Sequence, residues 1–338
     1  MQITLHSFLT LTALLPQAEP AKRLEVVTTL SVLKDIAEQV GGGRVHAEAL
    51  ADPRQDPHFV EPKPTLMQKA RAADVFVEVG LQLELWAEKV ASGSGNPRIQ
   101  TGQPGRVVAS LGVQALELPA VLSREWGDVH PYGNPHVWLD PLNVKIMAGN
   151  IASALKQVDP AGTEAYGQGL ELLEKRIDEA LFGPELVEQV GGRQLGRLAR
   201  QGRLAEYLER EQLSGALGGW LKKAAVLRGR PVVTYHKTSA YLADRFGFTV
   251  PIEIEEKPGI PPSARHRDRV LEVLREQKIK TILQEVFYER SAADYLAEKT
   301  GAHVLIVPID VGAKVGVPGY FELIDGILDQ LVRSENTP

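Results

Sequence analysis

The sequence predicts an α/β protein made of two lobes, each with a parallel sheet. In both halves of the chain, short runs of β-branched apolar residues alternate with stretches of helical periodicity, the order expected when helices connect parallel strands. A length of 338 residues exceeds one small core and suggests two domains of about 150 residues each. One long helical pattern fills residues 160–182. We therefore expect lobes over residues 24–159 and 183–338, joined by one long rigid helix with a cleft between the lobes.

In the first half, strand and helix patterns follow each other closely. Ser31 can cap the first helix, and the glycines from Gly41 to Gly43 end it. The apolar run at residues 74–80, DVFVEVG, is typical of a strand buried on both faces of a parallel sheet. The expected strands are residues 24–30, 45–50, 74–80 and 106–110, and the expected helices are residues 31–40, 65–73, 83–92 and 142–158.

The second half repeats the alternation after an insertion. Residues 183–230 are rich in glycine and charge, with arginines interleaved among glutamates, which favours an amphipathic surface insertion over a nucleic-acid-binding segment. The strands expected after it are residues 231–236, 248–254, 281–286 and 303–309, with helices at residues 238–246, 265–277 and 291–300.

The composition excludes several classes of function. A net charge of -5 gives no basic footprint for nucleic acid. The sequence contains no cysteine, which excludes disulfides, thiolate metal sites and cysteine catalysis, and argues against a lipoprotein anchored through an N-terminal cysteine. Any metal site must therefore use the eight histidines together with aspartate and glutamate.

The first 23 residues resemble a secretory signal. Phe8 to Leu15 is a short apolar run, closed by Pro16 and followed by an alanine-containing polar stretch. The run lacks a preceding lysine or arginine, so a disordered or strand-forming start is the alternative. No later segment approaches the roughly 20 apolar residues of a membrane span, and we expect an exported, soluble protein.

Four side chains stand where strands of the predicted lobes end. His58 and His136 each follow a proline and precede a helix start, in DPHFVEPKP and GNPHVWLDP, while His236 closes one strand and Asp310 follows another. Ligands of α/β sheets bind at the carboxyl ends of strands, and three imidazoles with one carboxylate suit a tetrahedral divalent ion. Taken singly, each residue has an ordinary interpretation: a half-buried histidine near Trp138, a polar strand edge or a turn aspartate.

Seven segments in order resemble the metal-binding subunits of zinc and manganese ABC transporters, the cluster A-I substrate-binding proteins. The resemblance implies two α/β lobes joined by one long helix, with the ion held between them. It places the ligands on His58, His136, His236 and Asp310, with Glu285 supporting them. A histidine rather than a glutamate at the third position favours Zn²⁺ over Mn²⁺. The segments are VVTTLSVLKDIAEQVGG, DPHFVEPKP, ADVFVEVGLQLELW, GNPHVWLDP, VVTYHKTSAYLADRFG, ILQEVFYERSAADYLAEKTGA and VPIDVGA.

The resemblance implies a periplasmic, high-affinity zinc-binding protein that delivers Zn²⁺ to an ABC transporter permease in the inner membrane. We expect a monomer that is not an enzyme and has no organic substrate. The alternatives are the same fold binding Mn²⁺ or Fe²⁺, a zinc-dependent hydrolase with Glu285 as base, and an adhesion role. The loop before the second ligand contains only His130, which we interpret as a solvated loop residue rather than a metal collector.

Overall fold

Two parallel sheets form the centre of the protein. The computed structural model describes residues 23–119, 130–257 and 259–336. The first sheet has four strands in the order β2-β1-β3-β4, and the second has three in the order β5-β6-β7, all parallel. This arrangement confirms the expected α/β class. The strands are β1 (Leu24–Thr28), β2 (Val45–Ala49), β3 (Val75–Glu78), β4 (Arg106–Val108), β5 (Val233–Thr234), β6 (Thr281–Glu285) and β7 (His303–Val307).

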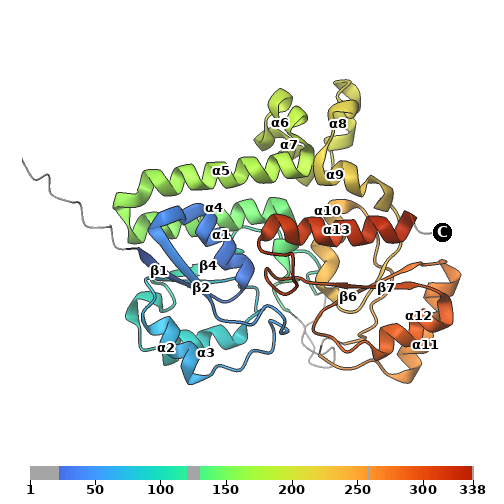
Figure 1. Cartoon of the computed structure of the whole chain (residues 1–338), viewed down its shortest axis with the longest axis horizontal. Coiled ribbons are helices and arrows are strands. Elements are labelled where there is room, and N and C mark those ends of the chain that lie inside the picture. Colours follow the sequence, from blue (N-terminus) through green and yellow to red (C-terminus); the bar gives the residue numbers. More distant parts are fainter. Residues whose placement is uncertain (1–22, 120–129, 258, 337–338) are drawn as a thin grey trace, which may run out of the picture.

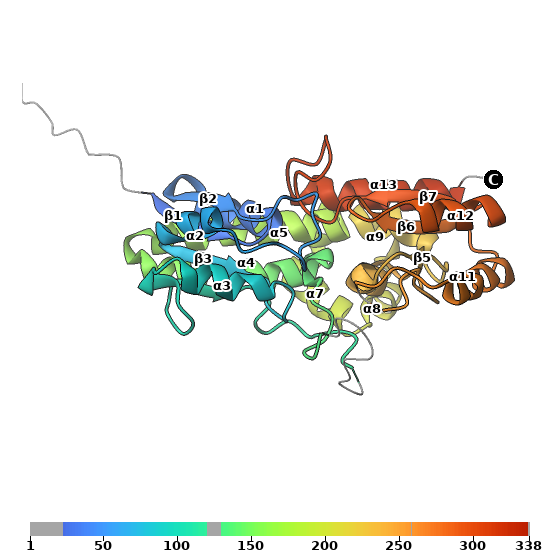
Figure 2. The same ribbon diagram turned by 90° about the horizontal axis from the view of Figure 1, so that it is seen from below.

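Helices cover both faces of each sheet (Figures 1 and 2). In the first lobe, α1 and α4 cover one face and α2 and α3 lie on the other, while in the second lobe α13 lies opposite α11 and α12. We call the two sheets with their covering helices the first and the second lobe. The covering helices are α1 (Ser31–Gly41), α2 (Pro64–Arg71), α3 (Leu85–Gly93), α4 (Pro141–Val158), α10 (Ala240–Phe246), α11 (Ala264–Glu276), α12 (Ser291–Thr300) and α13 (Tyr320–Asn336).

A single long helix, α5 (Thr163–Phe182), runs along the molecule above the first lobe (Figure 1). Its 20 residues span about 30 Å. It packs against α4 and α1 on one side and α9 near its end. The helix begins at Thr163, after a 3-10 turn over Pro160–Gly162, and so nearly fills the expected range 160–182.

The segment after α5 folds into short helices that stand out from the body (Figure 1). They are α6 (Pro184–Val190), α7 (Gly192–Arg200), α8 (Leu204–Arg210) and α9 (Gly219–Lys223). Their apolar residues Leu186, Leu195 and Leu208 are buried and belong to the main hydrophobic core. Although these helices project from the lobes, the insertion therefore shares the main hydrophobic core and is not only a surface segment.

Three expectations about the elements were wrong. The expected strand at residues 248–254 forms only isolated bridges, from Thr249 to Pro231 and from Glu253 to Thr234. The sequence interpretation missed α13, whose apolar face is buried against the core. His58 and His136 also lie on loops far from the preceding strand ends, because β2 stops at Ala49 and β4 at Val108.

The segment around Trp138 ties the two lobes together. Trp138 donates its indole N–H to the carbonyl of Ile309 at 2.7 Å, and its own carbonyl accepts the hydroxyl of Tyr320 at 3.0 Å. Arg245 of α10 forms a two-pronged ion pair with Asp140, with both N–O distances 2.8 Å. These buried polar contacts fix the position of His136, which lies in the same segment.

Within the described residues, no helix has the length and apolar character needed to cross a membrane. The secretory signal expected in the first 23 residues lies outside the described residues, except for Arg23.

Candidate metal site

Three histidines from both lobes converge on one point. One ring nitrogen of each of His58, His136 and His236 lies within 4.8 Å of the others. Their ring centroids are 5.2 to 5.6 Å apart. His58 and His136 come from loops of the first lobe, and His236 follows β5 of the second. The chain thus brings together three residues that are 78 and 100 positions apart in sequence.

The first two histidines are each held by a local turn of the same type. In DPH, Asp56 Oδ1 accepts the backbone N–H of His58 at 3.0 Å and contacts its ring Nδ1 at 2.7 Å. In NPH, Asn134 Oδ1 accepts the backbone N–H of His136 at 3.0 Å and contacts its Nδ1 at 2.9 Å. An acceptor at Nδ1 places the proton there and leaves the Nε2 lone pair free. Each turn therefore aims Nε2 at the centre of the group.

His236 receives the same support from a distant residue. Its Nδ1 lies 2.6 Å from Glu255 Oε2, and both side chains are buried. A carboxylate on the outer nitrogen fixes the tautomer and raises the basicity of the inner one, as in many metal sites. Sequence reasoning missed all three supporting residues. The repeated Asx-Pro-His pattern carried a signal for Asp56 and Asn134, whereas nothing in the sequence singles out Glu255.

The inner nitrogen of His136 has no hydrogen-bond partner in the described part of the chain. His136 is 1% exposed, and its Nε2 is a buried atom without a hydrogen bond among the described residues. A buried polar atom left unpaired costs about 1–3 kcal/mol. A cation at the centre of the three rings would satisfy this lone pair, so the donor set fits a metal ion.

Burial and neighbouring charges set the protonation of the rings. Burial lowers the pKa of His136 well below its usual value, and repulsion from His58, His236 and His130 adds to the effect. For His236, burial also lowers the pKa, but the hydrogen bond and charge of Glu255 outweigh it, so that the pKa is raised. His136 is thus neutral and ready to bind a cation, whereas His236 binds a proton in competition with the cation.

Asp310, the fourth expected ligand, stands apart from this group. Its Oδ1 accepts the backbone N–H of Val32 at 2.6 Å and of Val311 at 2.9 Å, while Oδ2 accepts that of Ser31 at 3.0 Å. The carboxylate therefore holds the start of α1 against the end of β7. Burial raises its pKa to about 6, against the lowering effect of these three N–H groups.

Glu285, expected to support the ligands, lies at the end of β6. Burial raises its pKa to about 7, and the opposing influences are a hydrogen bond with Thr238 and the charge of His236. Its Oε2 is buried and unpaired among the described residues. Glu285 thus lies in the electrostatic field of the site, but the hydrogen bond that orients His236 comes from Glu255.

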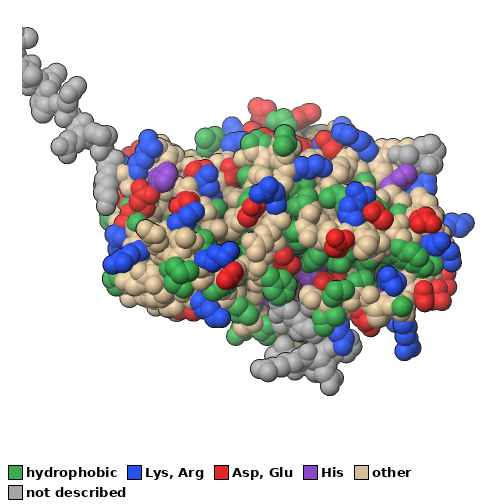
Figure 3. Space-filling view, turned by 60° about the horizontal axis from the view of Figure 1, so that its bottom comes forward, with side chains coloured by type: hydrophobic (Ala, Val, Ile, Leu, Met, Phe, Trp, Pro, Cys, Tyr) green, Lys and Arg blue, Asp and Glu red, His purple; other side chains and the backbone are tan. Residues whose placement is uncertain are grey.

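The interpretation of His130 as a solvated loop residue was wrong. Its Nε2 lies 3.1 Å from Nε2 of His58, and the two rings stack with centroids 5.1 Å apart. Burial lowers the pKa of His130 to about 3, and repulsion from His58 and His236 contributes. The residue therefore contacts the histidine group through His58. In Figure 3, only a small area of histidine surface is visible near the centre of the face that the view shows.

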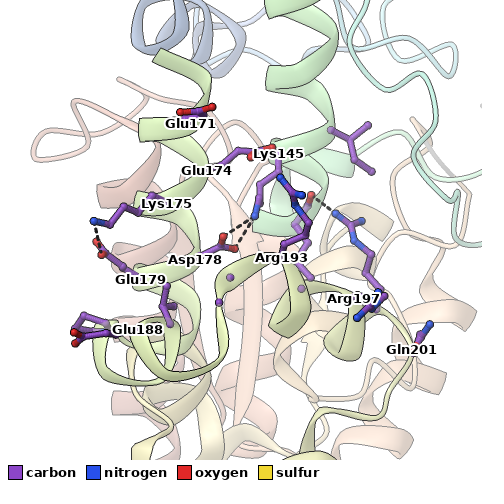
Figure 4. Close-up of a pocket in the computed structure, with 18 residues that line it drawn as sticks. Lys145, Glu171, Glu174, Lys175, Asp178, Glu179, Glu188, Arg193, Arg197 and Gln201 are labelled. Carbon is purple, nitrogen blue, oxygen red and sulfur yellow. Dashed lines mark hydrogen bonds and ion pairs between the residues drawn. The ribbon is translucent and has the colours of Figure 1, made fainter. Parts of the chain in front are cut away.

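A cavity among the described residues lies away from this site. It has a volume of about 900 Å³ between α4, α5, α6 and α7 and includes none of the histidines. Figure 4 shows charged side chains of both signs around it, with Lys145 of α4 paired to Asp178 of α5 at 2.7 Å. Because its charges are of both signs and two ion pairs, Lys145–Asp178 and Lys175–Glu179, lie within it, we assign it no ligand.

Comparisons with known proteins agree with this architecture. The sequence model of the periplasmic zinc-uptake complex component A family, ZnuA, matches residues 26–181 and 204–334. This chain belongs to that family. The segment between the two matched ranges, residues 182–203, contains the helices α6 and α7.

Relatives within the family differ in the metal that they are named for. The iron-binding protein YfeA of Yersinia pestis is 30% identical over 341 residues, which cover 98% of this chain and 93% of the relative. The manganese ABC transporter lipoprotein PsaA of Streptococcus anginosus is 29% identical over 48% of this chain and 50% of its own length. A crystal structure of ZnuA, 20% identical, covers 93% of this chain and 100% of its own with a TM-score of 0.67. The chain is thus a metal-binding, substrate-binding protein of an ABC transporter.

Proposed function

We propose that this protein captures Zn²⁺ between its two lobes and delivers it to an ABC transporter permease in the inner membrane. The proposal depends above all on one observation: His136 Nε2 is buried, has no hydrogen bond to any residue that the structure describes, and lies within 4.8 Å of ring nitrogens of His58 and His236. The three rings replace part of the hydration shell of the ion. Because two of them come from the first lobe and one from the second, the bound ion joins the lobes.

The donor set supports zinc over manganese. Neutral imidazoles suit Zn²⁺, whereas carboxylate, carbonyl and water oxygens suit Mn²⁺. Asp310 is the oxygen ligand implied by the resemblance. Its carboxylate oxygens already accept three backbone N–H groups, so an ion would compete with these hydrogen bonds for the same oxygens. The names of YfeA and PsaA make Fe²⁺ and Mn²⁺ the second candidates, and competition between the three ions decides among them.

The first test replaces His136 by alanine. Structural zinc sites bind with an apparent free energy of about 10–16 kcal/mol. Divided over four ligands, each ligand contributes about 2.5–4 kcal/mol, which corresponds to a loss of two to three orders of magnitude in affinity. Competition with a chromophoric chelator measures this change. His46→Ala is the matched control, because His46 is an exposed histidine paired with Glu25, and its affinity should not change.

The second test measures the affinities for Zn²⁺, Mn²⁺ and Fe²⁺ under anaerobic conditions. We expect Zn²⁺ to displace the other two, and His136→Ala to lower the affinity for all of them. Preferential retention of Mn²⁺ or Fe²⁺ at equal concentration would make the chain a carrier of that ion. If purified protein bound none of the three at a 1:1 ratio, the proposed function would be wrong.

A further inference from the structure

Beside the three histidines, a fourth imidazole contacts one of them. His130 Nε2 is 3.1 Å from His58 Nε2. With Zn–N bonds of about 2.0–2.1 Å, two nitrogens on one tetrahedral ion are about 3.3–3.4 Å apart. The His58–His130 separation is thus close to the edge of such a tetrahedron.

The hydrogen bonds around this pair leave its two inner nitrogens facing each other. Asp56 Oδ1, at 2.7 Å, holds the proton of His58 on Nδ1, so His58 Nε2 is an acceptor. His130 also hydrogen-bonds to the backbone of Gln82, and this interaction favours the charged form of His130. A bond that favours the charged ring is one in which a ring N–H donates, so the acceptor is the carbonyl of Gln82. A neutral imidazole has one N–H only, and His130 cannot serve both Gln82 and His58 with it.

The backbone at Gln82 is unusual in a way that serves this contact. Leu81 and Gln82 have φ angles of 55° and 62°, in the left-handed region that residues other than glycine rarely adopt. Two such residues in succession turn the chain sharply just after β3, which ends at Glu78. This turn brings the backbone of Gln82 to His130, as Asp56, Asn134 and Glu255 are brought to the other three rings.

We propose that His130 supplies the fourth ligand of the captured ion, giving a site of four imidazoles. This inference rests on the proposed function. A cation between the Nε2 atoms of His58 and His130 satisfies both lone pairs at once. Asp310 then keeps its place at the start of α1, where three backbone N–H groups already bind it, and joins the lobes without touching the ion.

A four-imidazole site has a consequence for selectivity. Nitrogen donors favour zinc and later transition metals, while replacing an oxygen donor by nitrogen disfavours manganese. His130→Asp would place an oxygen donor at the same position. We expect this variant to shift the ratio of Zn²⁺ to Mn²⁺ affinity toward Mn²⁺ relative to the unchanged protein.

The experiment counts imidazole ligands directly. Zinc K-edge X-ray absorption on the 1:1 zinc complex should show four imidazoles in the unchanged protein and three in His130→Ala. The affinity of His130→Ala for Zn²⁺ should fall about 100-fold, while His46→Ala binds as the unchanged protein does. Circular dichroism of the metal-free variants confirms that each one folds.

The outcomes separate this inference from the proposed function. If the unchanged protein binds zinc with three imidazoles and an oxygen donor, the inference is wrong and zinc capture stands. The same conclusion follows if His130→Ala leaves either the affinity or the imidazole count unchanged. If the unchanged protein binds no zinc, the proposed function itself fails.

Discussion

Replacing Glu255 by glutamine tests how the protein tunes its third ligand. Glu255 Oε2 lies 2.6 Å from His236 Nδ1, with the two side chains only 4% and 5% exposed. Glutamine keeps the shape and one acceptor oxygen, so His236 keeps its orientation, but the negative charge is lost. Loss of such a partner typically costs 10- to 100-fold in metal affinity, or about 1.4–2.8 kcal/mol.

The effect should depend on pH in a defined direction. Burial lowers the pKa of His236, but Glu255 raises it above its usual value on balance, so protons compete with zinc for this ring as the pH falls. Without the charge of Glu255 the pKa of His236 falls, and this competition weakens. The unchanged protein should therefore lose zinc affinity between pH 8 and pH 5.5 more steeply than Glu255→Gln. The difference in zinc affinity between the two proteins should become smaller as the pH falls.

The assay is chelator competition at pH 8, 7 and 5.5. Glu256→Gln is the matched control, because Glu256 is the adjacent residue and is exposed. Equal zinc affinity of Glu255→Gln and the unchanged protein at pH 8 would refute the role given to the buried carboxylate. If the difference in zinc affinity instead grew as the pH fell, the inference that Glu255 raises the pKa of His236 would be wrong.

Two further predictions concern the frame that holds the site. Asp140→Asn leaves buried Arg245 without its charge partner and should lower the free energy of unfolding by about 3 kcal/mol in urea titration; Asp52→Asn, which breaks an exposed pair, should cost less than about 1 kcal/mol. Gly169→Ala places a methyl group against the backbone carbonyl of Val40 and should cost about 1–3 kcal/mol. In contrast, Gly149→Ala meets nothing within 4 Å and should be neutral or stabilising by up to about 1 kcal/mol; equal effects of the two alanines would contradict the packing of α5 on α1.

Local patterns made most of the fold predictable. Alternating runs and caps located all seven strands and the helix α5 to within a few residues, because these signals depend on neighbouring residues alone. The shortest, β5, lies inside its expected range 231–236 and pairs only over Val233–Thr234. The expected strand at 248–254 failed because its pairing is decided by distant partners, and only two isolated bridges form.

The parts of the site that are formed by neighbouring residues could be predicted from the sequence. The two Asx-Pro-His turns position His58 and His136 within three residues of sequence, so their motifs were visible. The contact between His130 and His58 joins loops 72 residues apart, and Glu255 reaches His236 from 19 residues away. Such pairs arise from the packing of the lobes, and no spacing in the sequence indicates them.

Asn134 shows why one ring of the three has an amide partner instead of a carboxylate. Its Oδ1 accepts from His136, but its Nδ2 donates to the carbonyl of Lys237 at 2.7 Å and to Glu117 at 2.8 Å. An aspartate here would face two acceptors without a proton to offer. Since Lys237 directly follows His236, the amide couples the second ligand in the first lobe to the third in the second lobe. Asn134 therefore orients His136 with its oxygen and links it to the segment of His236 with its N–H group. A carboxylate has no N–H group and cannot form the second bond.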